Sequence, residues 1–157
     1  MKITLLVVGK TDAAYLRDGI DVYRKRLKHY INFELEIIPD IKKGKNTNPE
    51  IQKIKEGELI LAKLTAGKEL HLLDEKGKMF SSVEFSKFIE KKMINGPKEL
   101  LLVIGGPYGF SDEVYQRAQS KISLSRLTFS HQMVRLLCVE QIYRAFTILK
   151  GEPYHHV

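Results

Sequence analysis

Segments with the pattern of a strand and segments with the pattern of a helix alternate along this chain, and this alternation limits its fold more than any other feature. Short apolar runs, often β-branched, are typical of buried strands, and they occur at Ile3–Val8 and Leu100–Ile104. Phe33–Ile38 alternates with Glu34 and Glu36 and is expected to be a half-exposed strand, and Glu69–Asp74 is the next expected strand. Between them, apolar residues recur every three or four positions, as they do on one face of a helix. The alternation predicts an α/β fold with a mostly parallel sheet flanked by helices.

The expected helices cover residues 12–30, 49–63, 82–95, a short stretch after 111, and 132–149. Three of them follow a side chain that can cap a helix, namely Asn48, Ser81 and Ser111. Glu84 completes a capping box with Ser81. We expect Glu75–Lys78 to turn the chain and residues 122–130 to be short and partly extended. A length of 157 residues suits a single domain over 1–157.

The last expected helix, at 132–149, is apolar on more than one face. A helix that is apolar all round is buried, and a second copy of the chain is the simplest cover for the additional face. Cys138 lies in its apolar run and is expected to be a small core residue. Glu140 and Arg144 stand four positions apart in the favourable order for an ion pair. This pair is either structural or part of a functional site.

Charge and cysteine content narrow the class of partner. The chain has 26 Lys and Arg against 19 Asp and Glu, a net charge of +7, which favours an anionic partner: nucleic acid first, an anionic membrane second. The chain contains no run of about 20 apolar residues, which is the length needed to cross a membrane. One cysteine allows neither an intramolecular disulfide nor a cysteine zinc site. Met1–Lys10 is typical of a strand and not of a signal peptide, so we expect a cytoplasmic protein.

The strongest local signal is the glycine-rich loop Gly105–Phe110, which follows an apolar strand and precedes a helix. Ligands of open α/β sheets bind at the carboxyl ends of the strands, and glycines there let the backbone approach a ligand closely. The alternative is a plain tight turn with a helix cap. The loop matches neither the P-loop nor the G-x-G-x-x-G pattern, so a nucleotide-like ligand would be bound in another way.

Three further kinds of segment carry side chains that could bind or react. Ser123–Arg135 mixes small hydroxyl residues with loop character, and His131 within it is either a functional base or, as its position favours, a helix cap. Tyr154-His155-His156 could stack on a base or hydrogen-bond to it, whereas two histidines are too few for a zinc site. The basic segments Arg24–Lys28 and Lys42–Lys45 are candidates for phosphate contacts, although most charge runs are simply solvated faces.

Several motifs taken together resemble one family. They are the opening Met-Lys-Ile-Thr-Leu-Leu-Val-Val-Gly-Lys, Val-Ile-Gly-Gly-Pro-x-Gly at Val103–Gly109, Ser-Leu-Ser-x-Leu-Thr-Phe-x-His at Ser123–His131, Val-Glu-Gln-x-Tyr-Arg-Ala at Val139–Ala145, and Pro153-Tyr154-His155. Over essentially its whole length the chain resembles the RlmH family, the ribosomal RNA large-subunit pseudouridine methyltransferases of the SPOUT superfamily. The resemblance implies a SPOUT-type α/β knot, in which a mostly parallel sheet flanked by helices carries a C-terminal deep trefoil knot at roughly residues 70–157.

The resemblance also implies a reaction. The enzyme would be an S-adenosyl-L-methionine-dependent 23S rRNA (pseudouridine-N3)-methyltransferase, acting on a pseudouridine in helix 69 of 23S rRNA within assembled 70S ribosomes. It would be a homodimer with a site shared between subunits, and it would use no metal and contact no membrane. Matched by position, the residues that contact S-adenosyl-L-methionine would be Leu73, Gly105, Leu124, Ser125, Arg126, Leu127, Thr128 and Phe129.

The same matching places Arg144, Tyr154 and His155 in the catalytic site. N3 of the base carries a proton, so a group must accept that proton or stabilise the developing anion. Arg144 suits the second role as a permanent cation. His155 is the residue of the three that titrates near neutrality, and Tyr154 could stack on the base or orient it. Which residue, if any, is the general base is left open.

Three other functions are compatible with parts of the sequence. A non-catalytic ribosome-binding protein with a SPOUT shell would keep the basic patches without binding S-adenosyl-L-methionine. A SPOUT enzyme could act on transfer RNA, although a chain without an appended RNA-binding domain favours a target already shaped by the ribosome. A small-molecule α/β enzyme that uses the glycine loop for phosphate is disfavoured by the net charge of +7 and by the missing phosphate motifs.

Overall fold

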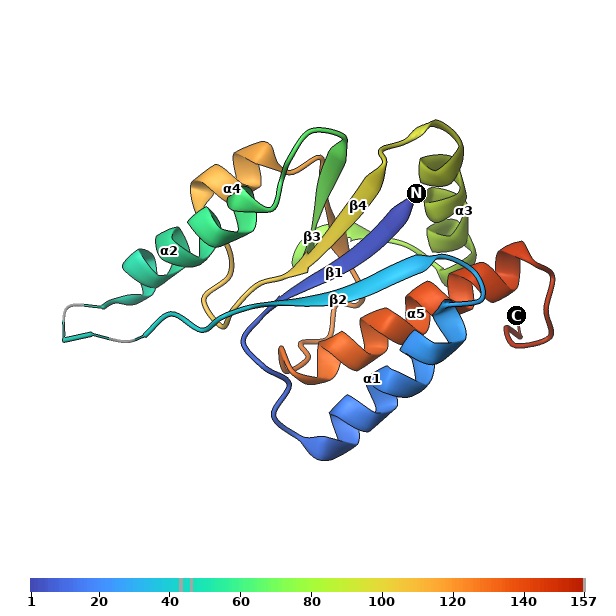
Figure 1. Cartoon of the computed structure of the whole chain (residues 1–157), viewed down its shortest axis with the longest axis horizontal. Coiled ribbons are helices and arrows are strands. Elements are labelled where there is room, and N and C mark those ends of the chain that lie inside the picture. The colour runs from blue at the N-terminus through green and yellow to red at the C-terminus, as the bar shows by residue number, and fades with distance from the viewer. Residues whose placement is uncertain (43, 46, 157) are drawn as a thin grey trace.

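The computed structural model describes residues 1–42, 44–45 and 47–156, and strands and helices alternate through it (Figure 1). In chain order the elements are β1 (Lys2–Val8), α1 (Ala14–Leu27), β2 (Asn32–Ile38), α2 (Pro49–Ala62), β3 (Lys68–Met79), α3 (Ser82–Asn95), β4 (Glu99–Ile104), α4 (Asp112–Arg117), β5 (Ser120–Ser123) and α5 (Met133–Leu149). The strands form a five-stranded sheet in the order β2-β1-β4-β3-β5, and every neighbouring pair is parallel. The predicted α/β fold class is therefore confirmed.

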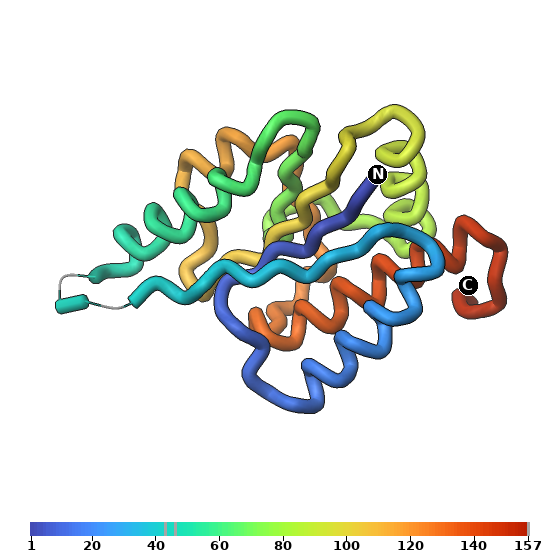
Figure 2. The backbone as a smooth tube through the Cα atoms, viewed as in Figure 1, coloured from blue at the N-terminus to red at the C-terminus, as the bar shows by residue number. Residues whose placement is uncertain are grey.

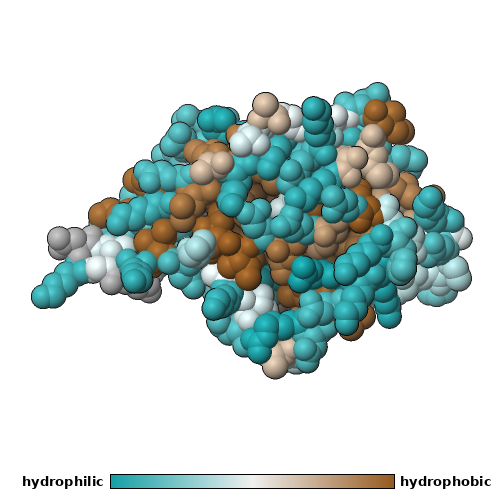
Figure 3. Space-filling model, in the orientation of Figure 1, coloured by the Kyte–Doolittle hydropathy of each residue, from teal (hydrophilic) through white to brown (hydrophobic). Residues whose placement is uncertain are grey.

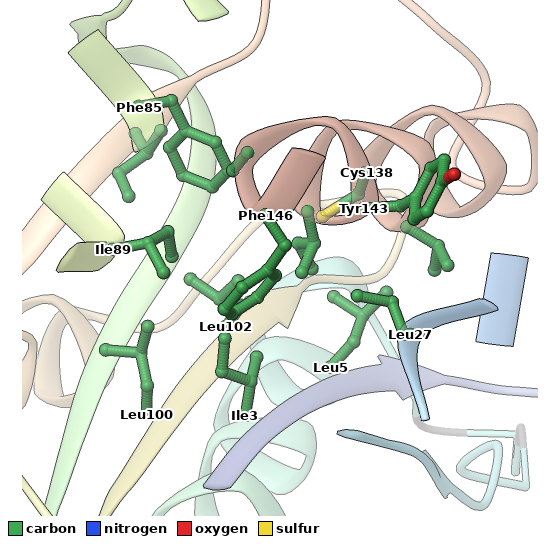
Figure 4. Close-up of a cluster of buried hydrophobic side chains, with 14 of the residues drawn as sticks. Ile3, Leu5, Leu27, Phe85, Ile89, Leu100, Leu102, Cys138, Tyr143 and Phe146 are labelled. Carbon is green, nitrogen blue, oxygen red and sulfur yellow. The ribbon is translucent and has the colours of Figure 1, made fainter. Parts of the chain in front are cut away.

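The sheet has helices on both faces because its central strands are apolar on both sides. On β1, Ile3, Leu5 and Val7 belong to one buried cluster, and Leu6 and Val8 belong to the other. The first cluster lies under α1, α3 and α5 and is drawn in Figure 4, whereas α2 and α4 cover the second. A parallel sheet buried in this way requires near-continuous apolar strands. It leaves the carboxyl ends of the strands as the region where a ligand can bind.

The three predicted helix caps are confirmed. The side chains of Asn48 and Ser111 each accept the backbone N–H three residues later, at 2.9 Å and 3.4 Å. The Ser81 hydroxyl accepts the N–H of Glu84 at 3.2 Å, and the Glu84 carboxylate accepts the N–H of Ser81 at 2.7 Å. This reciprocal pair is the capping box that the sequence predicts for α3.

The third strand is longer than the sequence predicts. The expected turn at Glu75–Lys78 is wrong, because β3 continues through it to Met79. A register shift lies between Leu73 and Lys78, after which the last residues of β3 pair with β5. Pairing with a neighbouring strand therefore outweighs the local turn preference of a glycine among charged residues. Beyond Ser123 the expected extended stretch is loop.

Among the helices, α5 is the one most deeply buried against the sheet. Cys138 is buried in it, and burial raises the pKa of its thiol to about 12, so it is the inert core residue that the sequence predicts. Leu136 of α5 packs on Gly19 of α1, where a Cβ atom would lie 3.1 Å from the leucine side chain. This close approach fixes α5 against α1 along the same face of the sheet.

Polar side chains cover most of the surface seen in Figure 3, and apolar side chains show between them as smaller patches. In the part of the chain that the structure describes, no helix is both long enough and apolar enough to cross a membrane.

Candidate active site

A cavity of about 510 Å³ lies where β4 and β5 end, beside the part of β3 at which its pairing with β4 stops. Its wall comes from three segments: Leu73–Lys76 within β3, the glycine loop Ile104–Phe110 after β4, and residues 122–125 and 127–129 at and after β5. Tyr115 of α4, and His131 and Val134 at the start of α5, complete it. The glycine loop thus lines a cavity at the carboxyl ends of the strands, as a ligand-binding loop of a parallel sheet would.

The glycine loop is shaped by two close backbone contacts. Gly109 has a φ of 80°, a conformation that favours glycine, and its N–H donates to the carbonyl oxygen of Gly106 at 3.1 Å. A Cβ atom on Gly106 would lie 2.8 Å from the carboxylate of Glu56 on α2. Larger residues at either position would therefore shift the loop that lines the cavity.

The loop after β5 is held by its own hydroxyl groups. Ser123 Oγ donates to the carbonyl oxygen of Ser125 at 2.9 Å, and Ser125 Oγ accepts the N–H of Leu127 at 3.0 Å. Thr128 and Phe129 follow and complete this side of the wall. Seven of the eight expected cofactor contacts thus line one cavity: Leu73, Gly105, Leu124, Ser125, Leu127, Thr128 and Phe129. The exception is Arg126, whose side chain is exposed and lies outside the lining.

The predicted helix cap at His131 is wrong. The N-cap position of α5 is Gln132, and its side chain makes no cap hydrogen bond. Ser130 Oγ accepts the N–H of Met133 at 3.0 Å, and His131 lines the cavity. The alternative that the sequence left open for His131, a functional base, stays a prediction.

Buried Arg135 fixes the start of α5 to the end of β1. Its guanidinium donates to the carbonyl oxygens of Val8 and Gly9 at 2.7 Å and 2.8 Å, and its Nε donates to the carbonyl oxygen of His131 at 3.1 Å. Burial lowers the pKa of this side chain. The three carbonyl contacts hold the loop that ends at His131 against the sheet, and so support one wall of the cavity.

Arg144, Tyr154 and His155 lie together at the other end of α5, with Glu140 at their centre. Glu140 Oε1 accepts hydrogen bonds from Arg144 Nε at 3.1 Å, from Arg144 Nη2 at 2.7 Å and from the Tyr154 hydroxyl at 2.9 Å. Arg144 Nη1 lies 3.2 Å from His155 Nδ1, and the guanidinium lies 4.7 Å from the centre of the Tyr154 ring. The structure therefore brings the three expected catalytic residues together.

Glu140 sets the electrostatics of this tail cluster, defined as Glu140, Arg144, Tyr154 and His155. Its hydrogen bonds raise the pKa of Arg144, which stays a cation. Burial and the nearby Tyr23 and Glu140 raise the pKa of Tyr154, which stays protonated. The predicted Glu140–Arg144 ion pair is confirmed at 2.7 Å, and both side chains are partly exposed. A partly exposed pair can still meet a substrate, unlike a fully buried structural pair.

The tail cluster is remote from the cavity of its own chain. Val134 lines the cavity and Arg144 follows ten residues later, which is about 15 Å along a helix that rises 1.5 Å per residue. Figure 2 shows the C-terminal tail at the opposite end of α5 from the loop that precedes this helix. A single copy of the chain thus holds the two groups of site residues apart.

The basic segment Arg24–Lys28 covers the end of α1 near the tail. Tyr30 just beyond it donates a hydrogen bond to Glu152 at 2.5 Å, and Arg26 lies over the ring of Tyr143, 5.5 Å from its centre. In the second basic segment, Lys42–Lys45, Lys43 lies outside the described residues. No group of three or more potential metal ligands occurs within residues 1–42, 44–45 and 47–156.

Two residues in the cavity wall, Asp74 and Tyr115, were not singled out by the sequence. The Tyr115 hydroxyl donates to Asp74 Oδ2 at 2.5 Å across 41 positions of sequence. The signal that could have found Asp74 is its place directly after an apolar strand, where parallel sheets bind ligands. Tyr115 carries no such signal, because only the fold brings α4 beside β3.

Comparison with known proteins identifies the family. A family model described as "Predicted SPOUT methyltransferase" matches residues 1–155. The chain is similar to the ribosomal RNA large subunit methyltransferase H of Parabacteroides distasonis and to that of Flavobacterium johnsoniae, with 62% identity over 156 residues in each case. It is 55% identical over 156 residues to the protein of that name from Bacteroides fragilis. Each alignment covers 99% of this chain and 99% of the relative. By these matches over nearly its whole length, the chain belongs to the SPOUT methyltransferase family, and within it to the ribosomal RNA large subunit methyltransferase H group.

Proposed function

We propose that this chain is an S-adenosyl-L-methionine-dependent enzyme that methylates N3 of a pseudouridine in helix 69 of 23S rRNA, acting on assembled 70S ribosomes in the cytoplasm. The observation that carries the proposal is the gathering of seven of the eight family-matched cofactor residues around one cavity. The relatives named ribosomal RNA large subunit methyltransferase H support RNA as the substrate. A net charge of +7 gives the attraction to phosphate that such a substrate requires.

The cavity suits a methyl donor built from a nucleoside and an amino acid. Its volume of about 510 Å³ is in the range typical of small-molecule sites. Apolar side chains such as Leu124 and Phe129 can pack on a purine ring, and backbone groups at Gly105–Gly109 can reach its polar edge. The donor, when bound, supplies an electrophilic methyl group on a positively charged sulfur.

The tail cluster acts on the base. Arg144 keeps its positive charge, so it stabilises the anion that forms as N3 loses its proton. His155 lies beside Arg144, with Nδ1 3.2 Å from the guanidinium, and its imidazole is the group of the cluster that accepts this proton. The Tyr154 ring, held by Glu140, offers a surface on which the base can stack.

We propose a homodimer in which each active site combines the cavity of one subunit with the tail cluster of the other. The separation of about 15 Å along α5 supports this arrangement, because methyl transfer requires the two reacting atoms within about 3.5 Å. The half-exposed apolar residues Val134 and Leu137 on α5 are surface that a partner subunit can cover.

Methyl transfer from labelled S-adenosyl-L-methionine tests the proposal. The substrates are 70S ribosomes, isolated large subunits and bulk transfer RNA, all from cells that lack the enzyme, and the modified nucleotide is mapped by mass spectrometry. We expect label on N3 of a helix 69 pseudouridine, strongest with 70S ribosomes.

Two results would contradict the proposal. Label on transfer RNA alone would favour a SPOUT enzyme with another target. Absence of label together with absence of S-adenosyl-L-methionine binding would favour the non-catalytic ribosome-binding protein.

A further inference from the structure

Asp74 is a carboxylate held rigidly in the wall of the cavity. It follows Leu73 at the point where the regular pairing of β3 with β4 ends. Its Oδ2 accepts the Tyr115 hydroxyl at 2.5 Å, and its Oδ1 accepts the N–H of Lys76 at 2.8 Å. Each oxygen has further lone pairs. Both oxygens can therefore accept one more hydrogen bond from a molecule in the cavity.

The surroundings of Asp74 keep its carboxylate in place. Burial and the hydrogen bond to Asp74 raise the pKa of Tyr115 to about 12, so the phenol remains the donor. Lys121 lies 5.6 Å from the centre of the Tyr115 ring and adds positive charge nearby. The adjacent Glu75 also lines the cavity, but its side chain is exposed. Of these two carboxylates in the cavity wall, Asp74 is thus the one that the fold holds in a defined position.

The rest of the wall gives Asp74 a specific task. Leu73, Ile104, Phe110 and Ile122 line the same cavity, and their side chains offer no acceptor to a hydroxyl group. A nucleoside that enters the cavity brings a ribose with two adjacent hydroxyls, and a carboxylate matches such a pair because it has two acceptor oxygens on one carbon. An acidic side chain near the carboxyl end of a strand serves ribose in this way in dinucleotide-binding folds.

We propose that Asp74 accepts hydrogen bonds from the 2′- and 3′-hydroxyls of the ribose of the nucleoside cofactor, and that Tyr115 is the positioning residue that orients Asp74. The inference rests on the proposed function, since it assigns a specificity residue to the same cavity. It makes the cavity selective for a ribonucleoside over its deoxy counterpart, because the partly exposed Asp74 carboxylate, once covered by a ligand without these hydroxyls, would lose its hydration without compensation.

A binding cycle with two ligands and two proteins tests the assignment. The ligands are S-adenosylhomocysteine and its 2′,3′-dideoxy analogue, and the proteins are the wild type and Asp74→Asn, measured by titration calorimetry. We expect Asp74→Asn to weaken S-adenosylhomocysteine binding by about tenfold to a hundredfold, the range for hydrogen bonds to a charged group. The dideoxy analogue should bind both proteins within about twofold of each other.

Glu113→Gln is the matched control, because it removes a negative charge from an exposed position of α4, the helix that carries Tyr115, outside the cavity lining. We expect it to change the affinity for either ligand by less than about twofold. Tyr115→Phe should weaken the binding of S-adenosylhomocysteine, but it should leave the affinity for the dideoxy analogue unchanged. A purely structural role of Tyr115 would instead weaken both ligands equally.

The outcomes separate this inference from the proposed function. If the wild type binds S-adenosylhomocysteine, but Asp74→Asn weakens both ligands by the same factor or neither of them, the assignment to ribose is overturned and the methyltransferase proposal stands. If the wild type binds neither S-adenosylhomocysteine nor S-adenosyl-L-methionine, both are overturned. Equal loss of affinity in Glu113→Gln and Asp74→Asn would show that the effect reflects only the net charge of the protein, and would also overturn the assignment to ribose.

Discussion

At the scale of single residues, the tail cluster depends on how Glu140 holds Arg144. Two guanidinium nitrogens meet one carboxylate oxygen, which fixes the direction in which the charge points. We predict that Arg144→Ala lowers the rate of methyl transfer by about a hundredfold to a thousandfold, as for loss of a charge-stabilising donor. The dissociation constant for S-adenosyl-L-methionine should stay unchanged, because Arg144 lies outside the cavity lining.

Arg144→Lys is the control for this prediction. It keeps the positive charge but loses the planar fork that meets Glu140, so it should retain more activity than Arg144→Ala. Equal loss of cofactor binding and of methyl transfer in Arg144→Ala would show that Arg144 supports the fold and not the reaction.

A second residue-scale prediction concerns pH and stability. His71 is buried between Ser120 and Glu69, with ring nitrogens 2.7 Å and 3.1 Å from their oxygens, and Lys92 lies against the same carboxylate. Burial lowers the pKa of His71, the charge of Lys92 acts in the same direction, and the hydrogen bond to Glu69 opposes both. The unfolded chain therefore binds more protons than the folded one below pH 6.5 or so.

It follows that the free energy of unfolding is fully developed above about pH 6.5 and decreases as the pH falls through this value, by at most about 1.4 kcal/mol per pH unit for one group. Urea unfolding at pH 5.5 and pH 7.5 measures this dependence. His71→Gln should flatten the slope in this window. An unchanged slope in the variant would assign the pH dependence to other groups.

Single residues were predictable from the sequence where the chemistry is local. The helix caps at Asn48 and Ser81 involve neighbours three positions away, and both could be predicted. The Asp74–Tyr115 hydrogen bond and the carbonyl contacts of Arg135 join elements far apart in sequence, so only the fold shows them. His131 is not the cap of α5, because the N–H of Met133 donates to the hydroxyl of Ser130 instead.

At the scale of elements, the capping box at the start of α3 contributes to the free energy of unfolding. Ser81→Ala removes the acceptor for the N–H of Glu84, and we predict that the free energy of unfolding falls by about 1 kcal/mol. Denaturant unfolding of Ser81→Ala is compared with that of Lys91→Ala on the exposed face of the same helix. A similar small effect in both variants would contradict a stabilising capping box.

In the proposed mechanism, the C-terminal tail supplies two of the residues that act on the base. Deletion of residues 154–157 removes Tyr154 and His155 but no part of the sheet. We predict that the far-UV circular dichroism spectrum and the affinity for S-adenosyl-L-methionine are kept, while methyl transfer is abolished. Full activity of the truncated protein would exclude the tail from the mechanism.

Helices and strands were predictable from the sequence where their apolar residues recur at a regular spacing. All the helices and four of the strands lie close to their expected places, because each carries its own pattern of apolar residues. The continuation of β3 to Met79 was missed, since its residues are polar and become strand only by pairing with β5. The same pairing brings the loop after Ser123 to the cavity.

At the scale of the whole molecule, one copy of the chain holds the cavity and the tail cluster at opposite ends of α5. In the proposed homodimer, the partner subunit completes each site. In the proposed reaction, the net charge of +7 serves attraction to RNA and not the choice of nucleotide. The trefoil knot stays a prediction, because strand order and register do not define how the chain is threaded.

A heterodimer of two inactive variants tests this shared site most directly. One subunit carries Thr128→Trp, which fills the cavity from an exposed position of its wall, and the other carries Arg144→Ala. Each variant alone should be nearly inactive. The two subunits are produced together with different affinity tags, and the heterodimer is isolated on both tags in succession.

We predict that this heterodimer methylates 70S ribosomes at about half the wild-type rate, because one of its two symmetry-related sites combines an intact cavity with an intact tail. If each active site were built within one chain, both sites of the heterodimer would contain a defect. A heterodimer that binds S-adenosyl-L-methionine but transfers no methyl group would therefore contradict the shared site.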